Sequence, residues 1–231
     1  NPVIDGPTLS ADTAVVGDGL TCTASATDLN VEDSPTVTYE WSDGTTGPTY
    51  TVTMDNDVDS GIVCTVTADD GDGGTDTATA SATVLNTAPV IDGVTISPDP
   101  AYNDGALICT AIATDADGGS PIITYEWTGG ATGSELPLTS IIAASGDTLT
   151  CTATAEDEDG GTASDTASVT IENRAPTVTA SIEPAAPTKN STLTCSASES
   201  ADPDDDATTL SFTWTVADSP TLASSTPGTT S

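Results

Sequence analysis

Short runs of alternating apolar and polar residues recur along the chain, a period of two that indicates half-buried β-strands. In Leu20–Ala24 every second residue is apolar, and the pairs Leu107 with Cys109 and Leu193 with Cys195 repeat this pattern. A second type of strand that carries a cysteine is expected over Ile62–Val66 and again over Leu149–Ala153. We therefore expect these segments to be strands that bury one face.

A third strand type carries two aromatic or large residues on one face. Tyr39-Glu40-Trp41 places both rings on the same side and Glu40 on the other, and Tyr125–Trp127 and Phe212–Trp214 are the further copies. Clusters of Gly, Asp and Pro separate these runs, as turns between strands require. The strong helix formers Leu, Lys, Arg, Met and Glu are sparse, which gives little support to long helices. The pattern predicts an all-β protein.

The chain repeats itself with a period of about 87 residues. Pro2–Gly6 returns as Pro89–Gly93, 87 residues later, and Ala175–Val178 opens a third copy at the same interval. The cysteines and tryptophans follow the same period. We predict three repeats, at 1–86, 87–173 and 174–231, the third one truncated. The parent protein is expected to continue in both directions.

The five cysteines fit this repeat. Cys22 and Cys64 are 42 residues apart, as are Cys109 and Cys151, and the partner of Cys195 is expected just beyond the last residue. One bridge in each repeat would imply an oxidising compartment, and hence an extracellular or cell-surface location. Zinc is the competing interpretation, but the cysteines stand singly in alternating strands without short C-x-x-C spacing.

A cysteine strand, a tryptophan strand and a second cysteine strand, in this order, resemble the immunoglobulin-like β-sandwich. The gap from cysteine to tryptophan is longer than in antibody domains, and Ile62 and Leu149 stand where those domains have tyrosine. The chain is more similar to the PKD-like and Ig-like tandem repeats of large bacterial surface proteins. The linker Asn86–Pro89, the Tyr125–Trp127 strand and the acidic loop Asp157–Gly161 carry this resemblance.

The resemblance implies a spacer or adhesive stalk of tandem sandwiches, each closed by one intradomain disulfide. A bridge that closes a loop of this length should stabilise a domain by about 4 kcal/mol. Trp41, Trp127 and Trp214 are expected to be core residues that pack on the bridges.

The charge is strongly negative. Asp and Glu number 36 and the basic residues only two, Lys189 and Arg174, for a formal net charge of −34. Such a surface repels nucleic acid and attracts divalent cations. Histidine is absent from the sequence, which excludes His-based catalysis and His-ligated zinc. No apolar run is long enough to span a membrane.

Aspartates recur at equivalent places after the cysteine strands, and the loops concerned face the linkers in an Ig-like sandwich. The candidate metal ligands are Asp28, Asp70, Asp72, Asp115, Asp117, Asp157, Asp159, Asp202 and Asp204, with Asn30 as a counterpart in the first repeat. Clustered carboxylates and Gly-rich turns suit Ca²⁺. The same Asp-x-Asp-Gly-Gly pattern is also good turn chemistry on an acidic surface, and both interpretations stay open.

Three function classes follow. The first is a structural segment of a stalk, fibre or extracellular filament, with Ca²⁺ at the domain junctions and neighbouring repeats as partners; exposed strand edges offer lateral or end-to-end self-association. The alternative is an adhesin, a glycan- or protein-binding module, for which Tyr50 and Tyr102 are the only aromatic candidates outside the Tyr-x-Trp strands. We expect no enzyme, because the acidic pairs sit on polar turns without apolar pocket residues.

Overall fold

The computed structural model describes residues 1–29, 34–54, 57–139 and 142–215. Fifteen strands and no helix occur among these residues, so no described segment forms a helix that could span a membrane. Two compact units are present. The first comprises Asn1–Thr95, Thr110–Tyr125 and Thr152–Thr166, and the second comprises Ile96–Cys109, Glu126–Cys151 and the described residues from Ala167 on.

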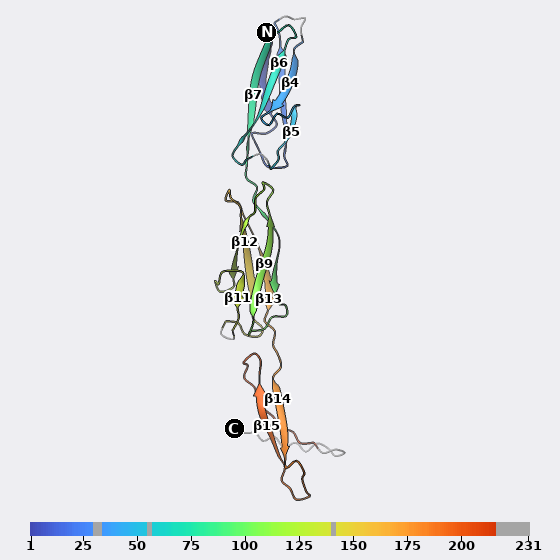
Figure 1. The fold of residues 1–231 in the computed structure, drawn as a ribbon, viewed down its shortest axis with the longest axis vertical. Helices are drawn as coiled ribbons and strands as arrows, with labels where there is room; N and C mark the ends of the chain where they lie inside the picture. The colour runs from blue at the N-terminus through green and yellow to red at the C-terminus, as the bar shows by residue number, and fades with distance from the viewer. Residues whose placement is uncertain (30–33, 55–56, 140–141, 216–231) are drawn as a thin grey trace. The chain divides into compact units, whose positions relative to one another are not determined.

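The first sandwich lies in the first unit and has two sheets (Figure 1). One sheet has the order β1-β3-β5, with β1 at Val3–Leu9, β3 at Gly19–Thr27 and β5 at Thr49–Thr51. The other has the order β2-β7-β6-β4, with β2 at Thr13–Ala14, β7 at Thr75–Val84, β6 at Gly61–Asp69 and β4 at Thr36–Trp41. All pairs are antiparallel except β2 with β7.

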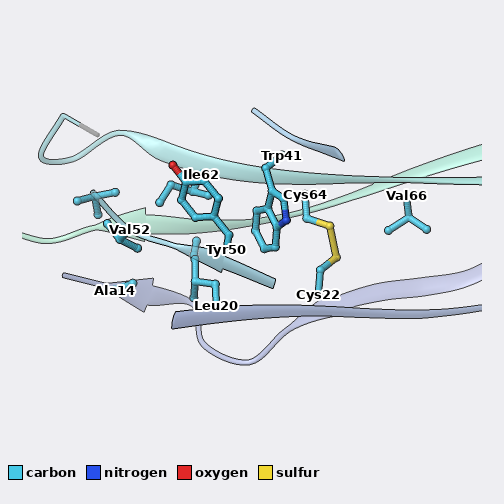
Figure 2. Packing of buried hydrophobic residues seen from close by; sticks show 11 residues of the cluster. Ala14, Leu20, Cys22, Trp41, Tyr50, Val52, Ile62, Cys64 and Val66 are labelled. Atoms are coloured by element: carbon cyan, nitrogen blue, oxygen red, sulfur yellow. A yellow bond between two sulfur atoms is a disulfide. The ribbon is translucent and has the colours of Figure 1, made fainter. Parts of the chain in front are cut away.

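The bridge Cys22–Cys64 joins β3 to β6 and therefore ties the two sheets together. Trp41 pairs with Cys64 across β4 and β6, and Figure 2 shows its indole beside the disulfide. The ring of Tyr50 stacks on the indole with centroids 5.1 Å apart. Both rings are buried, and they are the two aromatic side chains of a core cluster otherwise built from Val, Ala, Leu, Ile and the bridged Cys.

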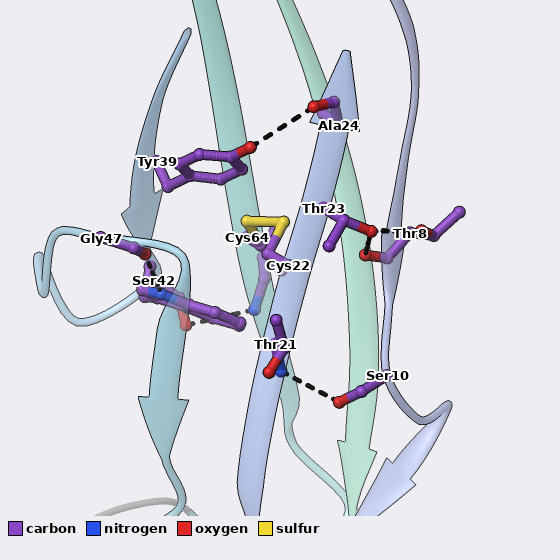
Figure 3. The surroundings of a disulfide bond; sticks show 12 residues. Thr8, Ser10, Thr21, Cys22, Thr23, Ala24, Tyr39, Ser42, Gly47 and Cys64 are labelled. Carbon is purple, nitrogen blue, oxygen red and sulfur yellow. Dashed lines mark hydrogen bonds between the residues drawn. A yellow bond between two sulfur atoms is a disulfide. The ribbon is translucent and has the colours of Figure 1, made fainter.

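Polar groups around this core are satisfied within the sandwich (Figure 3). The indole Nε1 of Trp41 donates to the carbonyl oxygen of Gly47 at 2.9 Å, and the backbone N–H of Thr21 donates to Ser10 Oγ at 2.9 Å. The hydroxyls of Thr8 and Thr23 lie 2.9 Å apart on β1 and β3. These hydrogen bonds help to explain how strands rich in Thr and Ser pair stably although they bury little apolar area.

The second sandwich repeats the arrangement. One sheet has the order β11-β9-β8, with β11 at Glu135–Pro137, β9 at Ala106–Thr114 and β8 at Val90–Ser97. The other has the order β10-β12-β13, with β10 at Ile122–Trp127, β12 at Thr148–Glu156 and β13 at Thr162–Thr170. Cys109 and Cys151 form its bridge, Trp127 is buried, and the Trp127 Nε1–H donates to the carbonyl oxygen of Gly133 at 2.9 Å.

The third copy contributes β14 at Thr177–Glu183 and β15 at Thr194–Ala201, an antiparallel pair. Cys195 is free, half-buried and opposite Ile182. The prediction of a strand over Phe212–Trp214 is wrong: the structure has only a single-residue bridge at Trp214, whose side chain is half-buried. In the other two copies this strand pairs with the second cysteine strand, and no such strand is described for the third copy.

The predicted all-β, Ig-like sandwich fold with one bridge in each complete repeat is confirmed. The expected boundaries at 86/87 and 173/174 stay a prediction, because the compact units each take part of the second sandwich.

Candidate metal centre

One acidic loop follows the second cysteine strand of each complete sandwich and is closed by its first aspartate. Asp157 Oδ1 accepts the backbone N–H groups of Asp159 at 3.0 Å and Gly161 at 2.7 Å. Its Oδ2 accepts the side-chain N–H of Asn86, at 3.1 Å. Asp157 therefore fixes its own loop and holds the segment that connects β7 to β8.

The glycines of this loop are needed for two different reasons. Gly160 has φ of 85°, a left-handed conformation that glycine adopts without strain. Gly161 has an ordinary φ, but a Cβ there would collide with the Asp157 carboxylate and lie 2.7 Å from Asn86 Nδ2. The repeated Gly-Gly pair therefore lets the carboxylate and the connecting segment come close together.

The loop after β9 brings two further carboxylates to the same segment. Asp115 Oδ1 accepts the backbone N–H of Asp117 at 2.7 Å, and Asp117 Oδ2 accepts a short hydrogen bond from the backbone N–H of Thr87. The other oxygens, Asp115 Oδ2 and Asp117 Oδ1, are buried without a hydrogen-bond partner, and so is Asn86 Oδ1. Buried carboxylate and amide oxygens without a donor cost free energy, and a bound cation would remove that cost.

A cavity of about 70 Å³ opens at this place, lined among others by Asn86, Asp115, Asp117 and Asp157. All of these residues belong to the first compact unit. Oxygen donors alone, without sulfur or imidazole, are the donor set of Ca²⁺. Among the described residues no three Asp, Glu or Cys side chains are already gathered as metal ligands. The oxygen donors therefore fit a hard cation in chemical type and in burial. Asn86 would have to supply its side-chain oxygen to complete the set of metal ligands.

The electrostatics of these loops keep their leading aspartates ionised. Hydrogen bonds from the backbone N–H groups of Gly74 and Asp72 lower the pKa of Asp70. Burial opposes ionisation of Asp157, but hydrogen bonds from Asn86 and from the loop backbone outweigh it and lower the pKa of this carboxyl as well. Ionised carboxylates can bind cations but cannot donate a proton as a general acid near neutral pH.

The other sequence-predicted ligands lie in three different settings. In the first sandwich, the Asp28 side chain is 1% exposed, and the amino group of Asn1 lies 3.5 Å from Asp28 Oδ2 and 3.8 Å from Asp70 Oδ2. Asp72 and Asp159 are exposed at the tips of their loops, and Asn30 falls outside the described residues.

The aspartates of the third copy face a protein cation. Asp202 Oδ1 accepts the backbone N–H of Asp204 at 2.9 Å, as Asp115 does for Asp117. Both oxygens of Asp204 accept hydrogen bonds from Arg174. The structure therefore places Asp115, Asp117 and Asp157 around the cavity at Asn86 without gathering the three described carboxylates as metal ligands, and it engages Asp204 with an arginine.

The sequence prediction missed two residues of these sites, Asn86 and Arg174. Asn86 binds Asp157 directly, and its recurrence as Asn173, 87 residues later, is the signal that could have identified it. Arg174 carried a signal too, because it is one of two basic residues and stands where the previous repeat has Thr87. The binding candidates Tyr50 and Tyr102 are not open platforms: Tyr50 is buried on Trp41, and Tyr102 lies under Arg174.

Solved structures similar to this chain include the fibronectin(III)-like modules of Clostridium thermocellum CbhA, with 16% identity, a TM-score of 0.30, and coverage of 74% of this chain and 94% of that one. Cadherin domains 1–5 of protocadherin gamma B2 match at 14% identity and a TM-score of 0.36, over 86% of this chain and 47% of that one. A Ca²⁺-stabilised adhesin of an ice-binding Antarctic bacterium matches at 23% identity and a TM-score of 0.27, over 79% of this chain and 52% of that one.

This chain thus spans about half the length of the protocadherin and adhesin chains. No family model matches the sequence, and no curated protein is detectably similar to it. At these scores the sheets and bridges of the chain itself carry the assignment to tandem Ig-like β-sandwiches.

Proposed function

We propose that the chain is a structural repeat segment of an extracellular or cell-surface stalk or filament, and that Ca²⁺ stiffens its first junction, defined as Asn86–Pro89 with the loops after β9 and β12. The observation that carries the proposal is the set of buried, unpartnered oxygens of Asn86, Asp115 and Asp117. The ionised carboxylates of the two loops repel one another, and a bound cation would remove that repulsion. Calcium concentrations outside cells suit sites of modest affinity in such modules.

Several features support a structural role without catalysis. The bridges Cys22–Cys64 and Cys109–Cys151 fit an oxidising location. The shifted carboxyls, Asp70 and Asp157 among them, have lowered pKa values, opposite to the shift that a general acid needs. The partners we propose are the neighbouring repeats of the same chain. The lack of an open aromatic platform at Tyr50 and Tyr102 disfavours the glycan-binding alternative.

Small-angle scattering tests this proposal. The chain is measured in 2–5 mM Ca²⁺ and in EGTA, at about 0.15 M salt so that general charge repulsion is screened. We expect a narrower distribution of dimensions with Ca²⁺, and loss of this response in Asp117→Asn. Asp92→Asn removes one charge from an exposed position on β8 and serves as the matched control. Identical profiles with and without Ca²⁺ in the unaltered chain would remove calcium from the account.

A further inference from the structure

The second junction, Asn173–Pro176 with the loop after β15, contains the only guanidinium group in the sequence. Arg174 Nε and Nη2 both donate to Asp204 Oδ1, at 2.9 and 2.8 Å, and Nη2 also donates to the carbonyl oxygen of Pro203 at 2.9 Å. Nη1 donates to Asp104 Oδ2 at 2.9 Å, and the guanidinium carbon lies 4.7 Å from the ring centre of Tyr102. All these residues belong to the second compact unit.

Two backbone hydrogen bonds of the first junction recur at this one. The N–H of Arg174 donates to Asp204 Oδ2, as the N–H of Thr87 donates to Asp117 Oδ2. The N–H of Asp204 donates to Asp202 Oδ1, and the equivalent bond is present in the first junction. The two junctions differ at the remaining carboxylate oxygen. Asp117 Oδ1 is buried without a partner, whereas Asp204 Oδ1 accepts two guanidinium N–H groups.

We propose that Arg174 is a built-in cation that takes the place of the metal at the second junction and makes that junction independent of calcium. This inference deepens the proposed function, since it rests on the cation site assigned to the first junction. The chain would then carry two kinds of connection between repeats of the same design. The first connection would be stiffened only when Ca²⁺ is bound. The second would be held by Arg174 at any calcium concentration.

The charges and burial of the second junction support this assignment. The side chain of Asp204 is 0% exposed and that of Arg174 is 27% exposed, so their ion pair is largely removed from solvent. The guanidinium fork directs two N–H groups at one oxygen of Asp204, and charge-assisted hydrogen bonds of this kind are stronger and more directional than a single charge contact. The backbone N–H of Arg174 and then its guanidinium lower the pKa of Asp204, and side-chain hydrogen bonds to Asp204 and Asp104 raise the pKa of Arg174. Both groups are therefore charged at any physiological pH.

Asn103 makes a second contact with Asp204 in this junction. Asn103 is buried, and its side-chain N–H donates to the carbonyl oxygen of Asp204 at 2.8 Å. The first repeat has Val15, Val16 and Gly17 where the second has Tyr102, Asn103 and Asp104. The residues that contact Arg174 and Asp204 are therefore specific to the second junction. This is expected if protein groups replace a metal ion there.

Amide hydrogen exchange, measured residue by residue by NMR on the whole chain, tests this inference. The amides of Thr87 and Arg174 are a matched pair, because each donates to the equivalent aspartate. In the unaltered chain we expect Ca²⁺ to slow exchange at Thr87 by about tenfold or more, and to leave Arg174 within about twofold of its slow rate in EGTA.

Three variants complete the test. Arg174→Thr should speed exchange of the amide at position 174 in EGTA by about tenfold or more, because the charged hydrogen bonds are lost. Arg174→Lys keeps the charge without the fork and should give an intermediate rate. Thr87→Arg brings a guanidinium to Asp117 without counterparts of Tyr102, Asn103 and Asp104, so it should slow exchange at position 87 in EGTA only in part and reduce its calcium response.

Two results would overturn the inference. The first is exchange at position 174 that slows on adding Ca²⁺ to the unaltered chain. The second is a rate in EGTA that Arg174→Thr leaves unchanged. If Arg174→Thr disturbs folding, the exchange rates in β9 reveal it, and Arg174→Lys then takes its place: a rate in EGTA equal to that of the unaltered chain would count against the inference. If the proposed function is wrong, the pattern is different. Exchange at Thr87 then does not respond to Ca²⁺, whereas Arg174→Thr still speeds exchange at position 174.

Discussion

Removal of the Cys22–Cys64 bridge should lower the stability of the first sandwich severely. We consider the double variant Cys22→Ala/Cys64→Ala, because alanine leaves no buried hydroxyl group without a partner. The bridge closes a loop of 42 residues, and the loop-entropy relation assigns about 4 kcal/mol to a loop of that length. For a domain of this size each kcal/mol corresponds to roughly 5 °C in melting temperature, so a shift of about 20 °C is expected.

Scanning calorimetry of the whole chain in EGTA measures this shift. One unfolding transition should move down by about 20 °C. The part closed by Cys109–Cys151 should stay within about 3 °C of its original midpoint, since distant changes add independently. Cys195→Ala removes a free, half-buried thiol and is the control. A double variant that melts within about 5 °C of the unaltered chain would refute the idea that the bridge supplies a large share of the stability.

Three further outcomes are expected. Gly161→Ala should weaken Ca²⁺ binding at the first junction at least about tenfold by calorimetric titration, because the new Cβ displaces Asp157 and Asn86; Gly93→Ala, where a Cβ meets nothing within 4 Å, should not. In calcium-free buffer, urea stability should fall as the pH drops below about 4, because Asp157 has a lowered pKa in the folded state, and Asp157→Asn should lose less than the unaltered chain. Trp127→Ala should lower the free energy of unfolding by about 3–5 kcal/mol in urea, as expected for a fully buried indole.

Repetition made much of the fold predictable from the sequence. The alternation in the cysteine and tryptophan strands, seen at intervals of 86 and 87 residues, predicted β3, β4 and β6, their counterparts in the second sandwich, and with them the two bridges. It also predicted that the acidic loops meet near the linker, which Asp157 and Asp117 confirm through their bonds to Asn86 and Thr87. Repeated residues share a structural role, so that role can be inferred from the pattern alone.

What the sequence could not reveal are the contacts that occur once. Tyr50 stacks on Trp41, but the second sandwich buries Leu136 at the corresponding place, so no repeated aromatic signal exists. The Arg174 network likewise has no counterpart at the first junction, and its partner Tyr102 is separated from it by most of a repeat. Such contacts depend on which loops the sandwiches bring together, and only the three-dimensional arrangement supplies that information.

Calorimetric titration of the whole chain with Ca²⁺, beside Asp117→Asn and the exposed-charge control Asp92→Asn, tests the central claim most directly. The account predicts that the unaltered chain and Asp92→Asn saturate with one more Ca²⁺ per chain than Asp117→Asn, with a dissociation constant on the order of 10⁻⁴–10⁻³ M or tighter. Equal stoichiometry in all three proteins would contradict it, because the buried oxygens of the first junction would then bind no metal.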